Sequence, residues 1–218
     1  FLSMEHNDLR QRCLDAINNV EWVPNWGQRR IYAMLEARPD WCLSRQRVWG
    51  VPIPAFHCRS CSDVIVNPDW IDHLADLFDE HTSDIWYEWS VDQLLPSGAC
   101  CSSCGSQELD KDSDILDVWF DSGVSYAATG HDSAPVDLYL EGSDQHRGWF
   151  HTTLLESVAT RGNPPYKRVL THGFVVDGQG KKLSKSKKNF TPVAQEISRS
   201  GAELIRLWAA SADYREDI

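Results

Sequence analysis

Two Cys-x-x-Cys pairs constrain the fold of this chain more than any other feature of its sequence. The pairs are Cys58–Cys61 and Cys101–Cys104. Four thiolates arranged in two such pairs are typical of one tetrahedral zinc ion. A site with four protein ligands leaves no open position, so we expect a structural ion. The pairs then close residues 57–108 into a small zinc-binding insertion.

The number of cysteines bears on the compartment and on alternatives to this site. The chain has seven Cys, and an odd number with two short pairs fits a reducing compartment better than a secreted disulfide framework. We therefore expect a cytoplasmic protein. Cys100 and His57 stand next to the pairs and are alternative ligands. The competing interpretation is four unrelated buried thiols.

Short β-prone runs alternate with helical patterns in the second half of the chain. A run over 136–140 precedes a helical pattern over 145–161, in which apolar residues recur four apart, and another β-prone run covers 168–171. This alternation predicts an α/β fold with a parallel sheet. The other predicted elements are helices over 9–20 and 28–37, a β-prone run over 115–120, a hairpin over 174–183 turning at Asp177-Gly178, a helix opened by Thr191-Pro192 and a helix after Gly201.

Charge and hydrophobicity exclude some classes of protein. The 218 residues include 21 Lys and Arg against 32 Asp and Glu, a formal net charge of -11. Such a chain does not hold nucleic acid mainly by neutralising phosphates. No apolar run reaches the roughly 20 residues that cross a bilayer, so we expect no membrane partner. The chain opens at Phe1 without an initiator Met, and we expect it to belong to a longer protein.

A turn rich in acidic residues and glycine joins the β-prone run over 136–140 to the next helix. It contains Glu141, Gly142, Ser143 and Asp144. Ligands of parallel α/β sheets bind at the carboxyl ends of the strands, and glycine lets the backbone approach a ligand closely. A carboxylate there accepts hydrogen bonds from ribose hydroxyls or an ammonium group. The alternative is that Ser143 and Asp144 only cap the helix.

Residues 180–188 read GKKLSKSKK and form a dense basic loop in an acidic chain. Lysine carries a compact charge on a flexible stem and suits phosphates. A mobile loop of this kind can close over a triphosphate and stabilise charge that develops during phosphoryl or adenylyl transfer. The alternative is a solvated basic loop or a weak nucleic-acid patch.

Five motifs follow one another along the chain in a recognisable order. They are SRQRVWGVPIP over 44–54, DVWFDSG over 117–123, LEGSDQHRGWF over 140–150, THGFVVDGQGKKLSKS over 171–186 and, within the last, KLSKS over 182–186. KLSKS resembles the KMSKS signature of class I aminoacyl-tRNA synthetases, with Leu in place of Met. The order and the combination of motifs resemble the isoleucyl-tRNA synthetase family within that class.

The resemblance implies an architecture. It is the second, C-terminal half of a Rossmann-type class I catalytic domain, of the α/β class, with a small zinc-binding insertion. The implied segments are a helical lead-in (1–56), the zinc insertion (57–108), a Rossmann half with the adenylate site and the KLSKS loop (109–190), and a helical segment leading toward an anticodon-binding domain (191–218).

The resemblance also implies roles for individual side chains. An aminoacyl-adenylate would be held at its amino group and ribose, its side chain walled by two Trp, its adenine near the HGF sequence and its phosphates near the lysine loop. The implied substrate-binding residues are Trp119, Glu141, Gly142, Asp144, Gln145 and Trp149, the ATP-binding residues are His172, Gly173, Phe174, Lys182 and Lys185, and the catalytic residues are Lys182 and Lys185, of which Lys185 is expected to stabilise the transition state.

The implied substrates of the full-length enzyme are isoleucine, tRNA(Ile) and ATP with Mg²⁺. The second signature of class I enzymes, HIGH, does not occur in this sequence. We therefore expect the chain to be inactive by itself and its exposed half-sheet to favour self-association. The alternatives are a catalytically inactive, synthetase-derived binding module that keeps the zinc, and a relative specific for valine or leucine.

Overall fold

The computed structural model describes residues 1–130, 135–184 and 189–218. The chain divides into two compact units. Unit 1 comprises residues 1–2 and 40–121, and unit 2 comprises residues 3–39 and 122–218. No helix in the described part of the chain is long and apolar enough to cross a membrane.

Unit 2 is built on a parallel three-stranded sheet, with strand order β1-β8-β7. The strands are β1 (Glu21–Val23), β7 (Tyr139–Gly142) and β8 (Arg168–His172). In the β7–β8 pair, Gly142 lies opposite His172. The carboxyl ends of these two strands therefore meet at one edge of the sheet, as the alternating pattern predicted.

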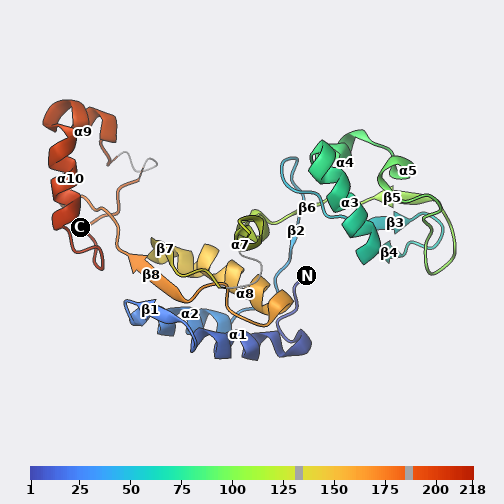
Figure 1. Ribbon diagram of the computed structural model, residues 1–218, viewed down its shortest axis with the longest axis horizontal. Coiled ribbons are helices and arrows are strands. Elements are labelled where there is room, and N and C mark those ends of the chain that lie inside the picture. Colours follow the sequence, from blue (N-terminus) through green and yellow to red (C-terminus); the bar gives the residue numbers. More distant parts are fainter. Residues whose placement is uncertain (131–134, 185–188) are drawn as a thin grey trace. The chain divides into compact units, whose positions relative to one another are not determined.

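Three helices accompany the strands of unit 2 (Figure 1) and contribute buried residues to its core. They are α1 (Leu9–Ile17), α2 (Trp26–Glu36) and α8 (Trp149–Arg161), and α1 contacts both α2 and α8. Residues 150–158 of α8 are all buried, which is typical of a helix surrounded by protein on every side. Gly162 ends α8 with φ 77°, a left-handed conformation that favours glycine.

Shorter elements complete unit 2. Residues 173–176 and 214–218 lie side by side, joined by backbone hydrogen bonds such as Gly173 N to Tyr214 O at 2.8 Å and Ile218 N to Phe174 O at 2.9 Å. The remaining helices are η1 (His6–Asp8), α7 (Ser125–Ala128), η2 (Ser143–Arg147), α9 (Val193–Ser200) and α10 (Ala202–Ser211).

Unit 1 contains an antiparallel sheet of order β4-β3-β5. Phe56, Leu74, Trp86 and Leu94 are fully buried in its core. Asn67 starts the longest helix, because its side-chain oxygen accepts hydrogen bonds from two backbone N–H groups of the first turn. The elements are β2 (Ser44–Arg45), β3 (Phe56–Cys58), β4 (Val64–Ile65), α3 (Pro68–His81), α4 (Ile85–Glu88), α5 (Val91–Leu94), β5 (Leu109–Lys111), β6 (Ile115–Leu116) and α6 (Val118–Gly123), which crosses into unit 2.

Most predicted elements are confirmed, and two of the β-prone runs are wrong in part. The run over 115–120 is a strand only at 115–116, because Asp117 accepts a hydrogen bond from Trp119 N and starts a helix. The run over 136–140 becomes a strand only at Tyr139, and Val136 forms an isolated bridge. The four implied segments stay a prediction.

Candidate functional site

The carboxyl ends of β7 and β8 bring the predicted adenylate residues of both strands together. Glu141 is the last residue but one of β7, and His172 is the last residue of β8. His172 Nε2 lies 3.9 Å from Glu141 Oε2, and both side chains are partly exposed. This edge of the sheet therefore presents a carboxylate and an imidazole to solvent.

Gly142 is required by the packing of this edge. A Cβ atom at Gly142 would lie 2.9 Å from a ring carbon of Phe174 and 2.9 Å from a carboxylate oxygen of Asp144. Both distances are too short for real side chains. The absence of a side chain at this position thus lets Phe174, from the segment after β8, approach the end of β7.

The predicted lysine loop reaches the same place. Lys182 Nζ lies 3.7 Å from Asp144 Oδ2 and 3.5 Å from the centroid of the Phe174 ring. An ammonium over an aromatic face is attracted by the ring quadrupole. Lys182 is thereby brought to the acid and glycine turn that the sequence singled out. Lys185, the other predicted phosphate ligand, lies outside the described residues.

The hairpin that carries Lys182 differs slightly from the predicted one. Asp177 N donates to Lys181 O, so the loop comprises residues 178–180 rather than a two-residue turn, and Gly180 adopts φ 74°. The Asp177 carboxylate accepts hydrogen bonds from Gln179 N at 2.9 Å and Lys181 N at 3.0 Å. A longer loop with a left-handed glycine is a common hairpin connection.

The sequence prediction missed Asn189, which braces this hairpin. Its side-chain oxygen accepts from Ser184 N at 3.0 Å. Its side-chain nitrogen donates to Asp177 Oδ2 at 2.9 Å and to Lys182 O at 3.3 Å. The position of Asn189 directly after the lysine-rich stretch was the available signal, because asparagine commonly bonds backbone groups of turns.

Gln145 and Trp149 lie where the turn becomes α8. The side-chain oxygen of Gln145 accepts a hydrogen bond from Trp149 N at 2.9 Å, so Gln145 helps to start the helix. The indole N–H of Trp149 is 3.0 Å from both Ser122 O and Ser125 Oγ. Ser143 and Asp144 were the alternative helix caps in the sequence. In the described geometry Gln145 takes this role, and Asp144 lies next to Lys182.

Trp119 is placed on α6 and belongs to unit 1. Its backbone N donates to Asp117 Oδ1 at 3.1 Å, and its side chain is partly exposed. Asp117 also binds Arg45 Nη2, at 2.5 Å, and Trp41 Nε1, at 3.0 Å. A role of Trp119 in a side-chain pocket stays a prediction.

The four predicted metal ligands do come together. Ligand atoms of Cys58, Cys61, Cys101 and Cys104 all lie within 4.8 Å of one another. Cys58 Sγ is 3.6 Å from Cys104 Sγ, and Cys61 Sγ is 3.6 Å from Cys101 Sγ. Zn–S bonds of about 2.3 Å in a tetrahedron separate the sulfurs by about 3.8 Å. The cluster therefore fits one metal ion.

A backbone hydrogen bond closes the turn at each Cys-x-x-Cys pair. Ser62 N donates to Cys58 O, and Gly105 N donates to Cys101 O. Gly105 has φ 74°, as expected for a glycine that completes a tight turn. His57 instead pairs with Asp112, at 3.0 Å. Its described partner is thus a carboxylate outside the four-cysteine group.

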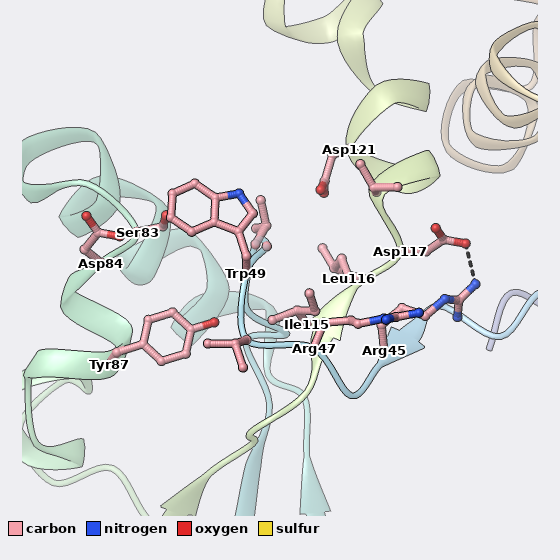
Figure 2. A pocket seen from close by; sticks show the side chains of 14 residues that line it. Arg45, Arg47, Trp49, Ser83, Asp84, Tyr87, Ile115, Leu116, Asp117 and Asp121 are labelled. Atoms are coloured by element: carbon pink, nitrogen blue, oxygen red, sulfur yellow. Dashed lines mark hydrogen bonds and ion pairs between the residues drawn. The ribbon is translucent and has the colours of Figure 1, made fainter. Parts of the chain in front are cut away.

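Unit 1 also contains a cavity of about 680 Å³, shown in Figure 2. The loop between β2 and β3 lines it with Arg47 and Trp49, and α4 lines it with Tyr87. Trp49 is 93% exposed, and the Arg45 guanidinium points toward Asp117. None of the predicted adenylate-binding residues lines this cavity.

The comparisons with known proteins agree with the motifs. The family model described as tRNA synthetases class I (I, L, M and V) matches residues 1–218. The isoleucine–tRNA ligases of Syntrophotalea carbinolica and Geobacter sulfurreducens are 56% and 54% identical to the chain over its full length. That of Kosmotoga olearia is 51% identical, again over the full chain.

The chain spans 24% of the length of each of these relatives. The chain is therefore about a quarter of each relative and not its C-terminal half, and the expected place in the second half of a catalytic domain stays a prediction. A crystal structure of a ternary LeuRS–tRNA–LeuAMS complex from Agrobacterium radiobacter shares the fold. Its TM-score is 0.57 at 24% identity, and the match covers 82% of this chain and 25% of that one. The chain belongs to the class I tRNA synthetase family of the isoleucine, leucine, methionine and valine enzymes.

Proposed function

We propose that this chain supplies the aminoacyl-adenylate half-site and the lysine loop of an isoleucine–tRNA ligase. The whole enzyme would activate isoleucine with ATP and Mg²⁺ to isoleucyl-adenylate and transfer the isoleucyl group to tRNA(Ile) in the cytoplasm. The observation that carries the proposal is the meeting of Glu141, His172, Asp144 and Lys182 at one edge of the parallel sheet. The names of the relatives support isoleucine as the amino acid.

The chemistry of this edge suits an aminoacyl-adenylate. The Glu141 carboxylate would bind the ammonium group, since a charge-assisted hydrogen bond is stronger than a neutral one. Asp144 and Gln145 would hold the ribose hydroxyls, and Gly142 would let the ligand approach the backbone. Lys182, together with Lys185, would neutralise the phosphates and the charge that develops during adenylyl transfer.

The other predicted residues would contact the adenine and the amino-acid side chain. His172, Gly173 and Phe174 would border the adenine. Trp149 would wall the isoleucine side chain, because a flat apolar ring suits a branched aliphatic group.

The four-cysteine cluster would hold a structural zinc ion. The sulfur separations suit tetrahedral thiolate coordination, and four protein ligands leave no position for substrate. Cys58, Cys61, Cys101 and Cys104 would thus tie together the two ends of the insertion. The ion would stabilise unit 1 and take no part in the reaction.

Calorimetric titration of the chain with isoleucyl sulfamoyl-adenosine tests the half-site. We expect saturable binding, tighter than for the valyl analogue and weakened in Glu141→Gln. Glu21→Gln is the matched control, because Glu21 is a similarly exposed carboxylate on the same sheet, paired with Arg168. No binding by folded protein, or equal binding by Glu141→Gln, would contradict the proposal.

A second assay separates binding from catalysis. The sequence lacks the HIGH signature, so the chain by itself should show no ATP–pyrophosphate exchange above background. Exchange by the purified chain would show that the rest of the enzyme is dispensable for activation and would overturn this part of the proposal.

A further inference from the structure

The side chains around Trp149 fix the plane of its indole ring from two directions. The Tyr139 ring is stacked on Trp149, with centroids 4.0 Å apart and an interplanar angle of 17°. The indole N–H points at Ser122 O and Ser125 Oγ, each 3.0 Å away. One face and one edge of the indole are thereby occupied, and Trp149 is only half-buried.

Tyr139 is itself held by its neighbours and can therefore support the indole ring. It is 4% exposed and also packs against the buried Tyr166, at 4.9 Å between ring centroids. Burial raises the pKa of its phenol. Its strand position fixes it further, because Tyr139 pairs with Val169 of β8, the central strand of the sheet.

Strand β7 carries both Tyr139 and Glu141, the residue predicted to bind the ammonium group. Tyr139 and Glu141 are two residues apart on β7, and alternate residues of a strand face the same side of the sheet. The strand that carries Glu141 therefore also fixes the orientation of the Trp149 ring, through the stacked ring of Tyr139. Tyr139, which supports the Trp149 ring, and Glu141 thus keep a constant separation because they belong to the same strand.

We propose that Ser125 and Tyr139 are positioning residues that set the selectivity of the amino-acid site for isoleucine over valine, acting through the orientation of Trp149. This inference rests on the proposed function. Isoleucine and valine differ by one methylene group, which a hydrophobic pocket distinguishes only weakly, by about 10- to 200-fold. Contact with that methylene depends on the position of the Trp149 ring. The hydroxyl of Ser125 and the ring of Tyr139 determine that position.

Ser125→Ala is the informative variant, because the indole N–H keeps its bond to Ser122 O and the fold should persist. Calorimetric titration with isoleucyl and valyl sulfamoyl-adenosine should show the ratio of the two affinities falling by about 2- to 10-fold, the effect of losing one neutral hydrogen bond. Ser125→Thr restores the hydroxyl and should restore the ratio. Ser157→Ala is the matched control, since this α8 hydroxyl bonds to Asn163 O instead.

A second pair of variants tests the stacked ring. Tyr139→Leu removes the aromatic face and should lower the ratio, whereas Tyr139→Phe keeps the ring and should retain it. Nitrogen-15 NMR of the Trp149 indole N–H, assigned with Trp149→Phe, gives a readout that needs no ligand. Its resonance should shift in Ser125→Ala and stay in place in Ser157→Ala.

The outcomes separate this inference from the proposed function. Failure of the unmodified, folded chain to bind either analogue overturns the half-site and the selectivity argument together. Normal binding with an unchanged ratio in both Ser125→Ala and Tyr139→Leu overturns this inference alone. An indole resonance that does not move in Ser125→Ala also counts against it.

Discussion

Lys182 places its ammonium nitrogen 3.5 Å from the centroid of the Phe174 ring. Phe174 in turn packs against Gly142 at the end of β7, so the ring links the lysine hairpin to the sheet edge. The tail of the chain holds the backbone of Phe174, because Phe174 N donates to Asp217 Oδ1 at 2.7 Å. The lysine that would contact phosphate is thus held beside Phe174 and Asp144, although half of its side chain remains exposed.

The first prediction concerns this ring. Phe174→Leu should weaken the binding of ATP with Mg²⁺ by about 2- to 5-fold, because a cation over an exposed aromatic ring contributes about 0.5–1 kcal/mol. Calorimetric titration measures the change. Phe174→Tyr retains an aromatic face and should bind ATP as the unmodified chain does. Equal affinities for the Leu variant and the unmodified chain would show that the ring does not position Lys182.

The second prediction concerns Asn189. Asn189→Ala removes the hydrogen bonds to Ser184 N, Asp177 Oδ2 and Lys182 O. The hairpin should then open more often, and trypsin should cleave it faster after Lys182, as followed by mass spectrometry. Gln179→Ala is the control, because the Gln179 side chain accepts a hydrogen bond from the Lys181 side chain at the tip, and the variant keeps the backbone bond of residue 179 to Asp177. An unchanged cleavage rate in Asn189→Ala would refute the bracing role.

The parts of the fold that sequence patterns predicted are those with a local cause. The period of α8 and its glycine end are visible in the sequence, and so are the paired cysteines. The predicted end of one strand near residue 117 and the predicted start of another near residue 139 were wrong because contacts with other residues decide them. The Asp117 carboxylate starts a helix in the first case, and pairing with β8 begins only at Tyr139 in the second.

The candidate site divides in the same way. Glu141 and Lys182 came from motifs, since each carries chemistry in its own side chain. Ser125 and Asn189 carry no motif, and their importance comes from partners distant in the sequence, such as Trp149 and Asp177. Such supporting residues become visible only when the chain is folded.

The third prediction concerns the cysteine cluster. The purified chain should carry about one zinc ion per molecule by elemental analysis. Cys58→Ser should lose it, and hydrogen exchange should rise in β3 and β5 but not in α8, because a structural ion contributes folding energy locally. Cys100→Ser is the matched control, since this exposed cysteine lies outside the described cluster. Folded protein without zinc, or loss of zinc in Cys100→Ser, would contradict the assignment.

The fourth prediction concerns His151, which is 2% exposed on α8. Burial, with a smaller contribution from the charge of Arg38, lowers the pKa of His151 from 6.5 to about 3. Between these values the unfolded state binds a proton that the folded state does not. The free energy of unfolding must therefore fall as the pH drops from 6.5 toward 3, and this contribution is intact above that window.

Between pH 7 and pH 5 the single group accounts for a loss of about 2 kcal/mol. Urea unfolding at the two pH values should show that loss in the unmodified chain and a loss smaller by about that amount in His151→Leu. His6→Gln changes an exposed histidine of the same unit and should keep the full pH dependence. If His151→Leu loses as much stability as the unmodified chain, the acid sensitivity of unit 2 has another source, of which His146 is the next candidate because burial also lowers its pKa.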